Sequence, residues 1–393
     1  MKFIPYGRQE ITQADIDAVV EVLKSDFLTQ GPAIESFEQA VCDYVGKRHA
    51  VACCNGTAAL HLAALAAGVA PGDICIVPAI TFAASANCIS YCGGKVVFAD
   101  VDDTVTASYD SCRAILEKYR AEKHPVKAVV TVDMAGNCCD RKAFKRLKEE
   151  FGFVWISDSC HRIVPEKDCG GPDMTVYSFH PVKHITTGEG GMVVTDSDEL
   201  AENLRLNRTH GITKDHKRFV NNSEAHDKNG EINPWYYEMQ TLGFNYRITD
   251  FQAALGASQL KRLDRSVLRR QQIVEIYKKH LGECKNIAFP KVSESGIHAY
   301  HLAIVLIDFE KIGKTRAAVM KYLRENSIGT QVHYIPVPIL PYYAEKANLG
   351  ELPNFETPNS MCYYKKALSL PCFPTMSDDD ALWVCEHLKR ICE

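Results

Sequence analysis

Residues 51–68 read VACCNGTAALHLAALAAG, and this stretch differs in character from the sequence before it. Its first residues form an apolar run that predicts a short buried strand. Asn55-Gly56 predicts a turn, and the alanine- and leucine-rich remainder predicts a helix that begins near Thr57. A strand followed directly by a helix is typical of an α/β fold.

Six further apolar runs follow, and helical segments separate most of the early ones. Strands that alternate with helices predict a mostly parallel sheet. The last two runs lie close together, which predicts a hairpin-like or edge arrangement late in this domain. The six runs are ICIVP, KVVFADV, AVVTVDM, VWISDS, TVYSFH and GMVVTD.

The segments on either side complete the domain plan. Residues 12–25 and 33–46 have helical spacing, and residues 249–282 predict a long, bent helix. The polar stretch 212–240 predicts a surface loop that ends at the aromatic group Trp235-Tyr236-Tyr237, and long ordered loops are often functional.

A chain of 393 residues usually forms about two domains. We expect a large domain at residues 1–250, with the mostly parallel sheet and an N-terminal helical segment. Residues 251–393 then form the linking helix and a smaller α/β domain.

Charge and hydropathy exclude several classes of protein. The net charge is −4 and the pI about 6.4, with no long Lys/Arg run, which argues against nucleic-acid and membrane-surface partners. No run of about 18 uncharged apolar residues exists to span a bilayer. The start, MKFIPYGRQE, lacks the layout of a secretory signal, so we expect a cytoplasmic protein.

The chain has 16 cysteines, but their spacing supports neither disulfides nor a metal site. Cys53 and Cys54 are adjacent, as are Cys138 and Cys139, and no C-x-x-C pair occurs. We expect most of these thiols to be reduced and buried as small hydrophobic groups.

Two polar features stand at the ends of predicted strands, where open α/β sheets bind ligands. Asn55-Gly56-Thr57 opens a helix, and free N–H groups there attract a phosphate, although Asn-Gly turns and Thr caps are also common without ligands. Asp158 closes VWISD, with His161 three residues later. That carboxylate is suited to hold a proton on a cofactor's ring nitrogen, or it only caps the next turn.

The third feature is Lys183, in the run Ser178-Phe-His-Pro-Val-Lys183. A glycine-rich turn and the apolar strand GMVVT follow it, and glycine lets backbone pass close to a bulky ligand. A lone lysine is usually a solvated charge. A lysine placed in an apolar pocket, however, loses its proton and becomes a nucleophile toward an aldehyde.

The run SFHPVKHITTGEGG, with DSCH and NGTAAL upstream, resembles the DegT/DnrJ/EryC/StrS family of sugar aminotransferases. Further resemblance covers nearly the whole chain, at LTQG (28–31), VPAITFAASAN (77–87), GFNYRITDFQAALGASQL (243–260) and QVHY (331–334). The family implies an aspartate-aminotransferase-like fold (PLP fold type I) and pyridoxal 5'-phosphate as the cofactor.

The resemblance implies a role for each matching residue. Lys183 would bind the cofactor covalently, Asp158 would pair with the pyridine nitrogen, and His161 would contact the side of the phenolic oxygen. Phe82 would stack on the ring, or it belongs to the core. Four residues would contact the phosphate: Gly56, Thr57, Ser178 and, from the neighbouring subunit, Asn245, which implies a homodimer with shared active sites unless Asn245 caps a helix near Thr249.

The implied reaction moves an amino group, with glutamate as the expected donor, onto a keto-sugar carried by a nucleotide. Related sugar dehydratases carry His where this chain has Lys183, which favours transamination. A non-catalytic PLP-binding regulator is the alternative from another class, and no DNA-binding module is attached.

Four segments resemble the branch that aminates a UDP-4-keto-6-deoxy-N-acetyl-altrosamine precursor in pseudaminic acid synthesis. They are LTQG, VDMAG (132–136), RTHGITKD (208–215) and NPWYYEMQTLGFNYR (233–247). Another UDP- or dTDP-4-keto-6-deoxy sugar is the alternative. The candidate substrate residues are Thr29, His210, Tyr236, His333 and Tyr334, whereas Tyr237 could equally belong to the core.

Overall fold

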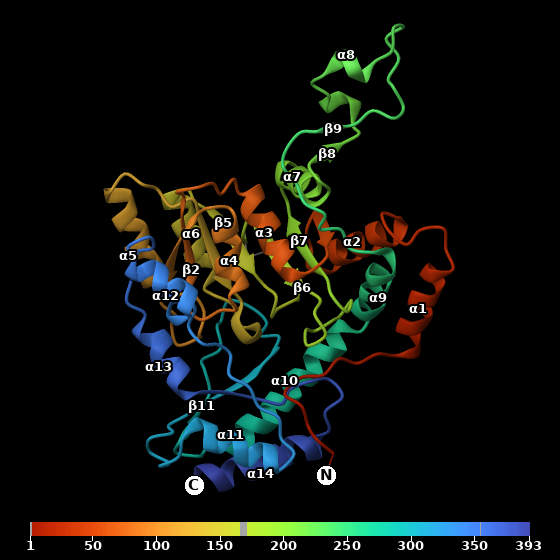
Figure 1. Cartoon of the computed structure of the whole chain (residues 1–393). Coiled ribbons are helices and arrows are strands. Elements are labelled where there is room, and N and C mark those ends of the chain that lie inside the picture. The colour runs from red at the N-terminus through yellow and green to blue at the C-terminus, as the bar shows by residue number, and fades with distance from the viewer. Residues whose placement is uncertain (1, 166–170, 354) are drawn as a thin grey trace.

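The computed structural model describes residues 2–165, 171–353 and 355–393, and these residues form sheets of seven, three and two strands (Figure 1). The large sheet has seven strands in the order β1-β7-β6-β5-β4-β2-β3. The strands are β1 (His49–Cys53), β2 (Ile74–Pro78), β3 (Lys95–Ala99), β4 (Ala128–Val132), β5 (Val154–Asp158), β6 (Met174–Ser178) and β7 (Gly191–Thr195).

The expected mostly parallel sheet is confirmed. Strands β3, β2, β4, β5 and β6 pair in parallel, and only β7 is antiparallel, to β6 on one side and β1 on the other. The predicted hairpin-like pairing of the last two runs is therefore correct. The edge of the sheet is formed by β1, however, because β7 lies between β1 and β6.

Alternate residues along each strand face two separate cores, because successive side chains of a strand point to opposite faces. Val51 and Cys53 pack with the helices α3 and α4, whereas Ala50 and Ala52 pack toward α2 and α9. Along strands β5, β4, β2 and β3, one face of the sheet is covered by α5 and α6. These helices are α2 (Pro32–Val45), α3 (Gly56–Ala66), α4 (Ala84–Tyr91), α5 (Tyr109–Ala121), α6 (Arg141–Phe151) and α9 (Asp250–Leu260).

The predicted long, bent helix is two helices, α9 and α10 (Leu263–Leu281), with a break at Lys261–Arg262. Figure 1 shows that α10 runs diagonally from the large sheet to the small one. The remaining helices along the chain are α1 (Gln13–Leu23), α7 (Asp198–Arg208), α8 (Asn222–Ala225), α11 (Arg316–Glu325), α12 (Pro341–Asn348), α13 (Pro358–Lys366) and α14 (Asp378–Cys392).

The smaller α/β domain is built on an antiparallel sheet of β10 (Ile287–Ala288), β11 (Ala303–Ile307) and β12 (Ala367–Leu370). Its core also contains Ile4 from the N-terminal segment and Tyr277 from α10. Val337 and Tyr343, although late in the chain, pack in the core of the large sheet. The division at residues 250 and 251 stays a prediction.

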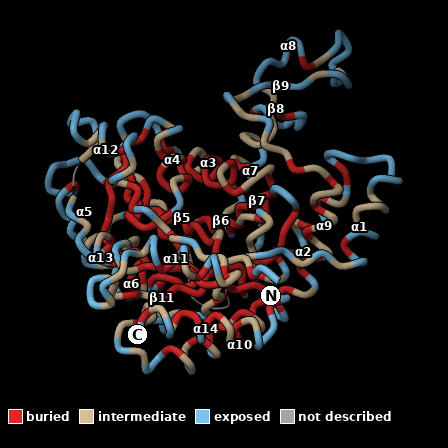
Figure 2. The backbone as a smooth tube through the Cα atoms, turned by 60° about the horizontal axis from the view of Figure 1, so that its bottom comes forward, coloured by how far each residue is buried: buried red, intermediate tan, exposed pale blue. Residues whose placement is uncertain are grey.

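The predicted surface loop at 212–240 is an arm that projects from the body (Figure 1). It carries the short strands β8 (Ile212–Thr213) and β9 (Glu238–Met239) and the helix α8. Figure 2 colours most of it as exposed. Trp235 is 73% exposed and Val220 83% exposed, so the arm exposes large apolar side chains.

The cysteines behave as expected. The structure describes 15 of the 16, all free, and ten of these are buried; Cys169 lies outside the described residues. Within the described part of the chain, no helix is long and apolar enough to cross a membrane.

Candidate active site

A cavity of about 470 Å³ opens at the carboxyl ends of the parallel strands, as open α/β sheets lead one to expect. Nine of the residues that the sequence singles out line it. They are Gly56, Thr57, Phe82, Asp158, His161, Ser178, Lys183, His333 and Tyr334.

Asp158 is the last residue of β5 and is only 6% exposed. Ser85 Oγ donates to Asp158 Oδ2 at 2.6 Å, and the backbone N–H of Cys160 donates to Oδ1 at 3.1 Å. One oxygen therefore caps the following turn, and the carboxylate as a whole lines the cavity, while its role toward a cofactor stays a prediction. Its hydrogen bonds fix the direction in which it faces a ligand.

Lys183 lies in the loop between β6 and β7 and lines the same cavity as Asp158. The side chain is half-buried. Burial lowers the pKa of Lys183 below its usual 10.5, although Cys160 and Asp158 act in the opposite direction. A lysine with a lowered pKa has more neutral amine at a given pH and is a better nucleophile.

The glycines after Lys183 serve the packing of protein against protein. A Cβ on Gly191 would lie 2.3 Å from the carbonyl oxygen of Asn55, and one on Gly190 would lie 2.1 Å from Thr187 Oγ1. Gly190 and Gly191 therefore allow a close approach to their own loop and to the turn before α3, whereas a Cβ on Gly188 would meet nothing within 4 Å. The expected approach of this turn to a ligand stays a prediction.

His161 is buried and is hydrogen-bonded through both ring nitrogens. The backbone N–H of Ala135 donates to Nδ1 at 3.3 Å, and Nε2 lies 3.2 Å from Tyr334 Oη. Because Nδ1 accepts a hydrogen bond, the proton of the neutral ring belongs on Nε2. Burial and the nearby charge of Lys183 hold the pKa of His161 well below 6.5.

The start of α3 forms the end of the cavity that suits an anion. Asn55 Oδ1 caps the helix by accepting from the N–H of Ala58 at 2.8 Å. The first N–H groups of a helix have no intrahelical acceptor and carry partial positive charge. A Cβ on Gly56 would lie 2.9 Å from Ser178 Cβ, so glycine is needed where this helix meets β6.

Aromatic residues cover the cavity on the other side. Phe82 is 60% exposed, which excludes the alternative that it belongs to the core. Its ring centroid lies 6.0 Å from that of Tyr334. His333 Nδ1 lies 2.8 Å from Ser369 Oγ, and burial lowers the pKa of His333 to about 4.

Four predicted residues lie outside the lining of this cavity: Thr29, His210, Tyr236 and Asn245. Thr29 pairs with Thr249, and Asn245 pairs with Thr209. The cap of α9 is Thr249, so Asn245 does not serve as the cap. Their assignment stays a prediction. Tyr237 is 54% exposed, so it does not belong to the core of this chain.

The sequence reasoning missed Tyr6, Ser85, Cys160 and His301. Tyr6, Cys160 and His301 line the cavity, and Ser85 binds Asp158. Ser85 lies three residues after Phe82 and Cys160 lies two after Asp158, so their proximity to motif residues is a usable signal. Tyr6 and His301 come from distant segments and carry no comparable local signal.

The arrangement of residues fits pyridoxal phosphate. The cavity brings together an amine of lowered pKa, a fixed carboxylate, an exposed aromatic ring and the N-terminus of a helix. Comparison with known proteins agrees, because the model of the DegT/DnrJ/EryC1/StrS aminotransferase family matches residues 9–389. The chain belongs to this family. It is a sugar aminotransferase, and enzymes of this family use pyridoxal phosphate.

Three relatives of this family member illustrate the range of similarity. The spore coat polysaccharide biosynthesis protein SpsC of Bacillus subtilis is 38% identical, over 99% of this chain and 97% of its own. A UDP-4-amino-4,6-dideoxy-N-acetyl-beta-L-altrosamine transaminase of Campylobacter jejuni is 34% identical, over 99% and 98%. The solved structure of Helicobacter pylori PseC, an aminotransferase of pseudaminic acid biosynthesis, matches with a TM-score of 0.87 at 26% identity, over 100% and 99%.

Proposed function

We propose that this aminotransferase transfers an amino group from glutamate to the C4 keto group of UDP-4-keto-6-deoxy-N-acetyl-altrosamine. The observation that carries the proposal is the meeting of Lys183 and Asp158 in one cavity beside the start of α3. The C. jejuni relative, named for the 4-amino sugar that this reaction would form, and the PseC likeness support the choice of substrate.

The residues that line the cavity have different roles in this reaction. Pyridoxal phosphate, when bound, supplies an aldehyde that takes up the amino group and a ring that absorbs negative charge. Lys183 would hold the cofactor through its amine, and the same amine is placed to act as base and acid toward a proton on the substrate carbon. Asp158 keeps a proton on the ring nitrogen, and its hydrogen bond from Ser85 fixes it in that position.

The remaining lining residues bind and orient. The N–H groups of Gly56 and Thr57 at the start of α3, with Ser178, hold the phosphate. Phe82 stacks on one face of the ring. His333 and Tyr334 bind the sugar substrate, together with Thr29, His210 and Tyr236.

We also propose a homodimer with shared active sites. The arm at 212–240 supports this, because its exposed apolar side chains need a partner and it joins the segment that carries Asn245. In the dimer, Asn245 reaches the phosphate of the neighbouring subunit. Replacement of Trp235 and Val220, which is 83% exposed, by serine should shift the proposed dimer to monomer in sedimentation. An unchanged dimer contradicts this use of the arm.

A panel of nucleotide keto-sugars with labelled glutamate tests the substrate. The altrosamine precursor should react at least about ten-fold faster than UDP-4-keto-6-deoxy-GlcNAc or dTDP-4-keto-6-deoxy-glucose, which corresponds to about 1.4 kcal/mol of discrimination. SpsC is the more identical of the two curated relatives described, so another keto-sugar is the alternative. Equal rates on all three sugars contradict the proposal. Loss of turnover with every sugar and donor favours the non-catalytic regulator.

A further inference from the structure

The substrates of the proposed reaction are anionic, but the cavity that would receive them has little positive charge. Among the described residues that line it there is one lysine, Lys183, and no arginine, whereas Asp158 and Glu189 are carboxylates. In the proposed reaction the amine of Lys183 is used by the cofactor. The carboxylate of an amino-acid donor and the diphosphate of a nucleotide therefore need a cation from outside this lining.

The histidines of the lining do not supply that charge. Burial is the main reason that the pKa values of His161 and His301 lie well below 6.5, and it lowers the pKa of His333 to about 4. These three rings are therefore neutral at pH 7. The fourth, His180, is exposed to water, which screens its charge.

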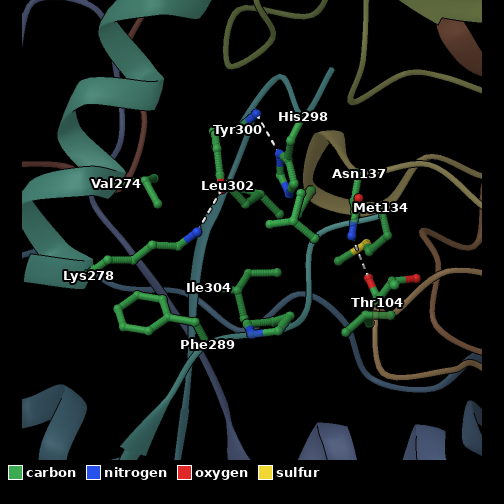
Figure 3. Close-up of a pocket in the computed structure, with 14 residues that line it drawn as sticks. Thr104, Met134, Asn137, Val274, Lys278, Phe289, His298, Tyr300, Leu302 and Ile304 are labelled. Atoms are coloured by element: carbon green, nitrogen blue, oxygen red, sulfur yellow. Dashed lines mark hydrogen bonds between the residues drawn. The ribbon is translucent and has the colours of Figure 1, made fainter. Parts of the chain in front are cut away.

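Another pocket with a cation in its lining offers no alternative. Figure 3 shows Lys278 of α10 pointing at Tyr300, and Lys278 Nζ donates to Tyr300 Oη at 3.1 Å. The pocket has a volume of about 30 Å³, which holds a water molecule but no substrate. The cation that the substrates need must lie elsewhere.

Arg247 is a half-buried arginine without a partner in this chain. It forms no hydrogen bond or ion pair with any residue that the structure describes, and it lies outside the lining of this chain's own cavity. A half-buried guanidinium in this position loses hydration and gains no bond in exchange. Its place in the fold therefore favours an anionic partner from outside this chain.

Arg247 belongs to an extended segment in which successive side chains point to opposite sides. The ring centroids of Phe244 and Tyr246 lie 4.9 Å and 5.9 Å from that of His61 on α3, so these two side chains face the body of the protein. Asn245, between them, is exposed. Asn245 and Arg247 therefore share the side that faces away from α3.

The backbone beside Arg247 is held firmly. The N–H of Cys54 donates to the carbonyl of Tyr246 at 2.8 Å, and the N–H of Tyr246 donates to the carbonyl of Arg208 at 3.0 Å. The side chain is held as well, because His61 Nδ1 lies 3.1 Å from Tyr246 Oη. Arg247 thus projects outward from a fixed base.

We propose that Arg247 is a substrate-binding residue of the neighbouring subunit: its guanidinium enters that subunit's cavity beside Asn245 and binds an oxyanion of a substrate, either the donor's carboxylate or the nucleotide's diphosphate. The planar guanidinium offers paired N–H donors that match both groups. The inference rests on the proposed homodimer and deepens it, because each cavity lacks a substrate-binding arginine until its partner supplies one.

Hybrid dimers test whether Arg247 acts across the interface. Arg247→Ala and Lys183→Ala chains with different affinity tags are coexpressed, and the hybrid is purified through both tags. Its one cavity with Lys183 receives an intact Arg247 from the other chain. The hybrid should have the wild-type KM values and about half the wild-type rate, because one of its two sites is complete, whereas both parent homodimers are defective.

Kinetics and equilibrium binding identify the oxyanion. In the Arg247→Ala homodimer, loss of a charge-assisted pair should weaken one substrate about 10- to 100-fold. A raised KM for glutamate, with weaker binding of 2-oxoglutarate to the apoprotein in calorimetry, identifies the carboxylate. A raised KM for the keto-sugar, with weaker binding of UDP, identifies the diphosphate.

Two further variants separate this role from a general loss of charge. Arg247→Lys should recover part of the lost affinity, because it keeps the charge without the paired donors. Arg146→Ala is the matched control, since Arg146 is an exposed arginine of α6 outside the cavity lining, and it should leave every KM unchanged. Sedimentation and thermal unfolding check that each variant is dimeric and folded.

The outcomes distinguish this inference from the proposals on which it rests. A hybrid as defective as the Arg247→Ala homodimer shows that Arg247 does not act in the partner's cavity. Unchanged KM values and affinities in Arg247→Ala, or equal losses in Arg146→Ala, overturn the binding role itself. If the wild-type protein sediments as a monomer, the proposed homodimer fails, and the inference fails with it.

Discussion

Ser85 donates its hydroxyl proton to Asp158 Oδ2 across 2.6 Å, in the interior of the protein. Thr81 Oγ1 lies 2.6 Å from the same hydroxyl, so it donates in turn to Ser85. The residue proposed to hold a charge on the cofactor ring is thus itself held by a chain of two hydroxyl groups from the segment after β2. This arrangement gives the first prediction.

Replacement of Ser85 by alanine should reduce kcat/KM about 10- to 100-fold, because a hydrogen bond to a charged group contributes about 1.5 to 3 kcal/mol. Steady-state kinetics and cofactor titration measure it. Ser90→Ala is the control, since Ser90 lies on the same helix and its hydroxyl lies 3.4 Å from Tyr343 Oη, away from Asp158. Equal kinetics in both variants would show that Asp158 does not depend on Ser85.

Replacement of Lys183 by alanine should abolish the visible band that the covalently bound cofactor gives. Activity should fall by about 10³-fold or more, because the proton-transfer group is also lost. Mass spectrometry after borohydride reduction should find the cofactor attached to Lys183 in the wild type and no adduct in Lys183→Ala. Lys127→Ala is the control, because Lys127 directly precedes β4, at the end of that strand away from the cavity. This variant should retain the visible band and the adduct. An adduct in Lys183→Ala sinks the assignment.

The lowered pKa of Lys183 predicts how cofactor capture depends on pH. Because the folded pKa lies below 10.5, neutral amine accumulates at lower pH than on a free lysine. The rate at which apoprotein develops the visible band should therefore rise with pH, with a midpoint below 10.5. Stopped-flow absorbance measures this profile. A midpoint at or above 10.5 is incompatible with the burial of this amine.

Replacement of Gly56 by alanine should weaken cofactor binding. The added Cβ would lie 2.9 Å from Ser178 Cβ, so α3 must move away from β6. Overpacking of this kind costs about 1 to 3 kcal/mol, which predicts at least about a ten-fold rise in the cofactor's Kd. Gly7→Ala is the matched control, because its Cβ would meet Val182 at an ordinary 3.9 Å. Unchanged affinity in Gly56→Ala would argue against a phosphate at this helix.

Acid should destabilise the apoprotein through its buried histidines. Burial lowers the pKa of His184 to about 3 and that of His333 to about 4, against about 6.5 in the unfolded chain. Below pH 6.5 the unfolded chain therefore binds protons that the folded chain does not. Each such histidine should lower the free energy of unfolding by up to about 1.4 kcal/mol per pH unit, down to its folded pKa.

Urea unfolding at pH 7.5 and pH 5 measures this loss. His184→Gln should lose less stability between the two values than the wild type, whereas replacement of the exposed His124 should not change the loss. A loss in His184→Gln as large as that of the wild type would show that His184 is protonated in the folded state.

The sequence indicated the centre of the site because that centre follows from strand ends. Asn55, Asp158 and Ser178 each come at or just after the end of a strand, and a mostly parallel sheet brings such positions to one edge. Lys183 could be predicted for the same reason, because the loop that carries it begins directly after β6. Motif resemblance supplied the roles that position alone does not give.

The remaining contacts depend on tertiary packing. Tyr6 reaches the cavity because Ile4 bridges to Ile328 at the edge of the small domain, and His301 does so because the small domain crosses at Gly136. The sequence also did not show that β1, rather than β7, forms this edge of the sheet. Local pattern does not specify which strand pairs with which.

The reversal of β7 has a consequence for engineering. The loop that carries Lys183 leaves the sheet at Ser178 and returns at Gly191, and these two residues are paired neighbours. The segment between them has both ends fixed side by side, and its outside hydrogen bonds go to Gln252 and Gln259 of α9 and to Ala299. Grafting the equal-length loop of a relative into this position would transfer a lysine environment between enzymes while both strands keep their register.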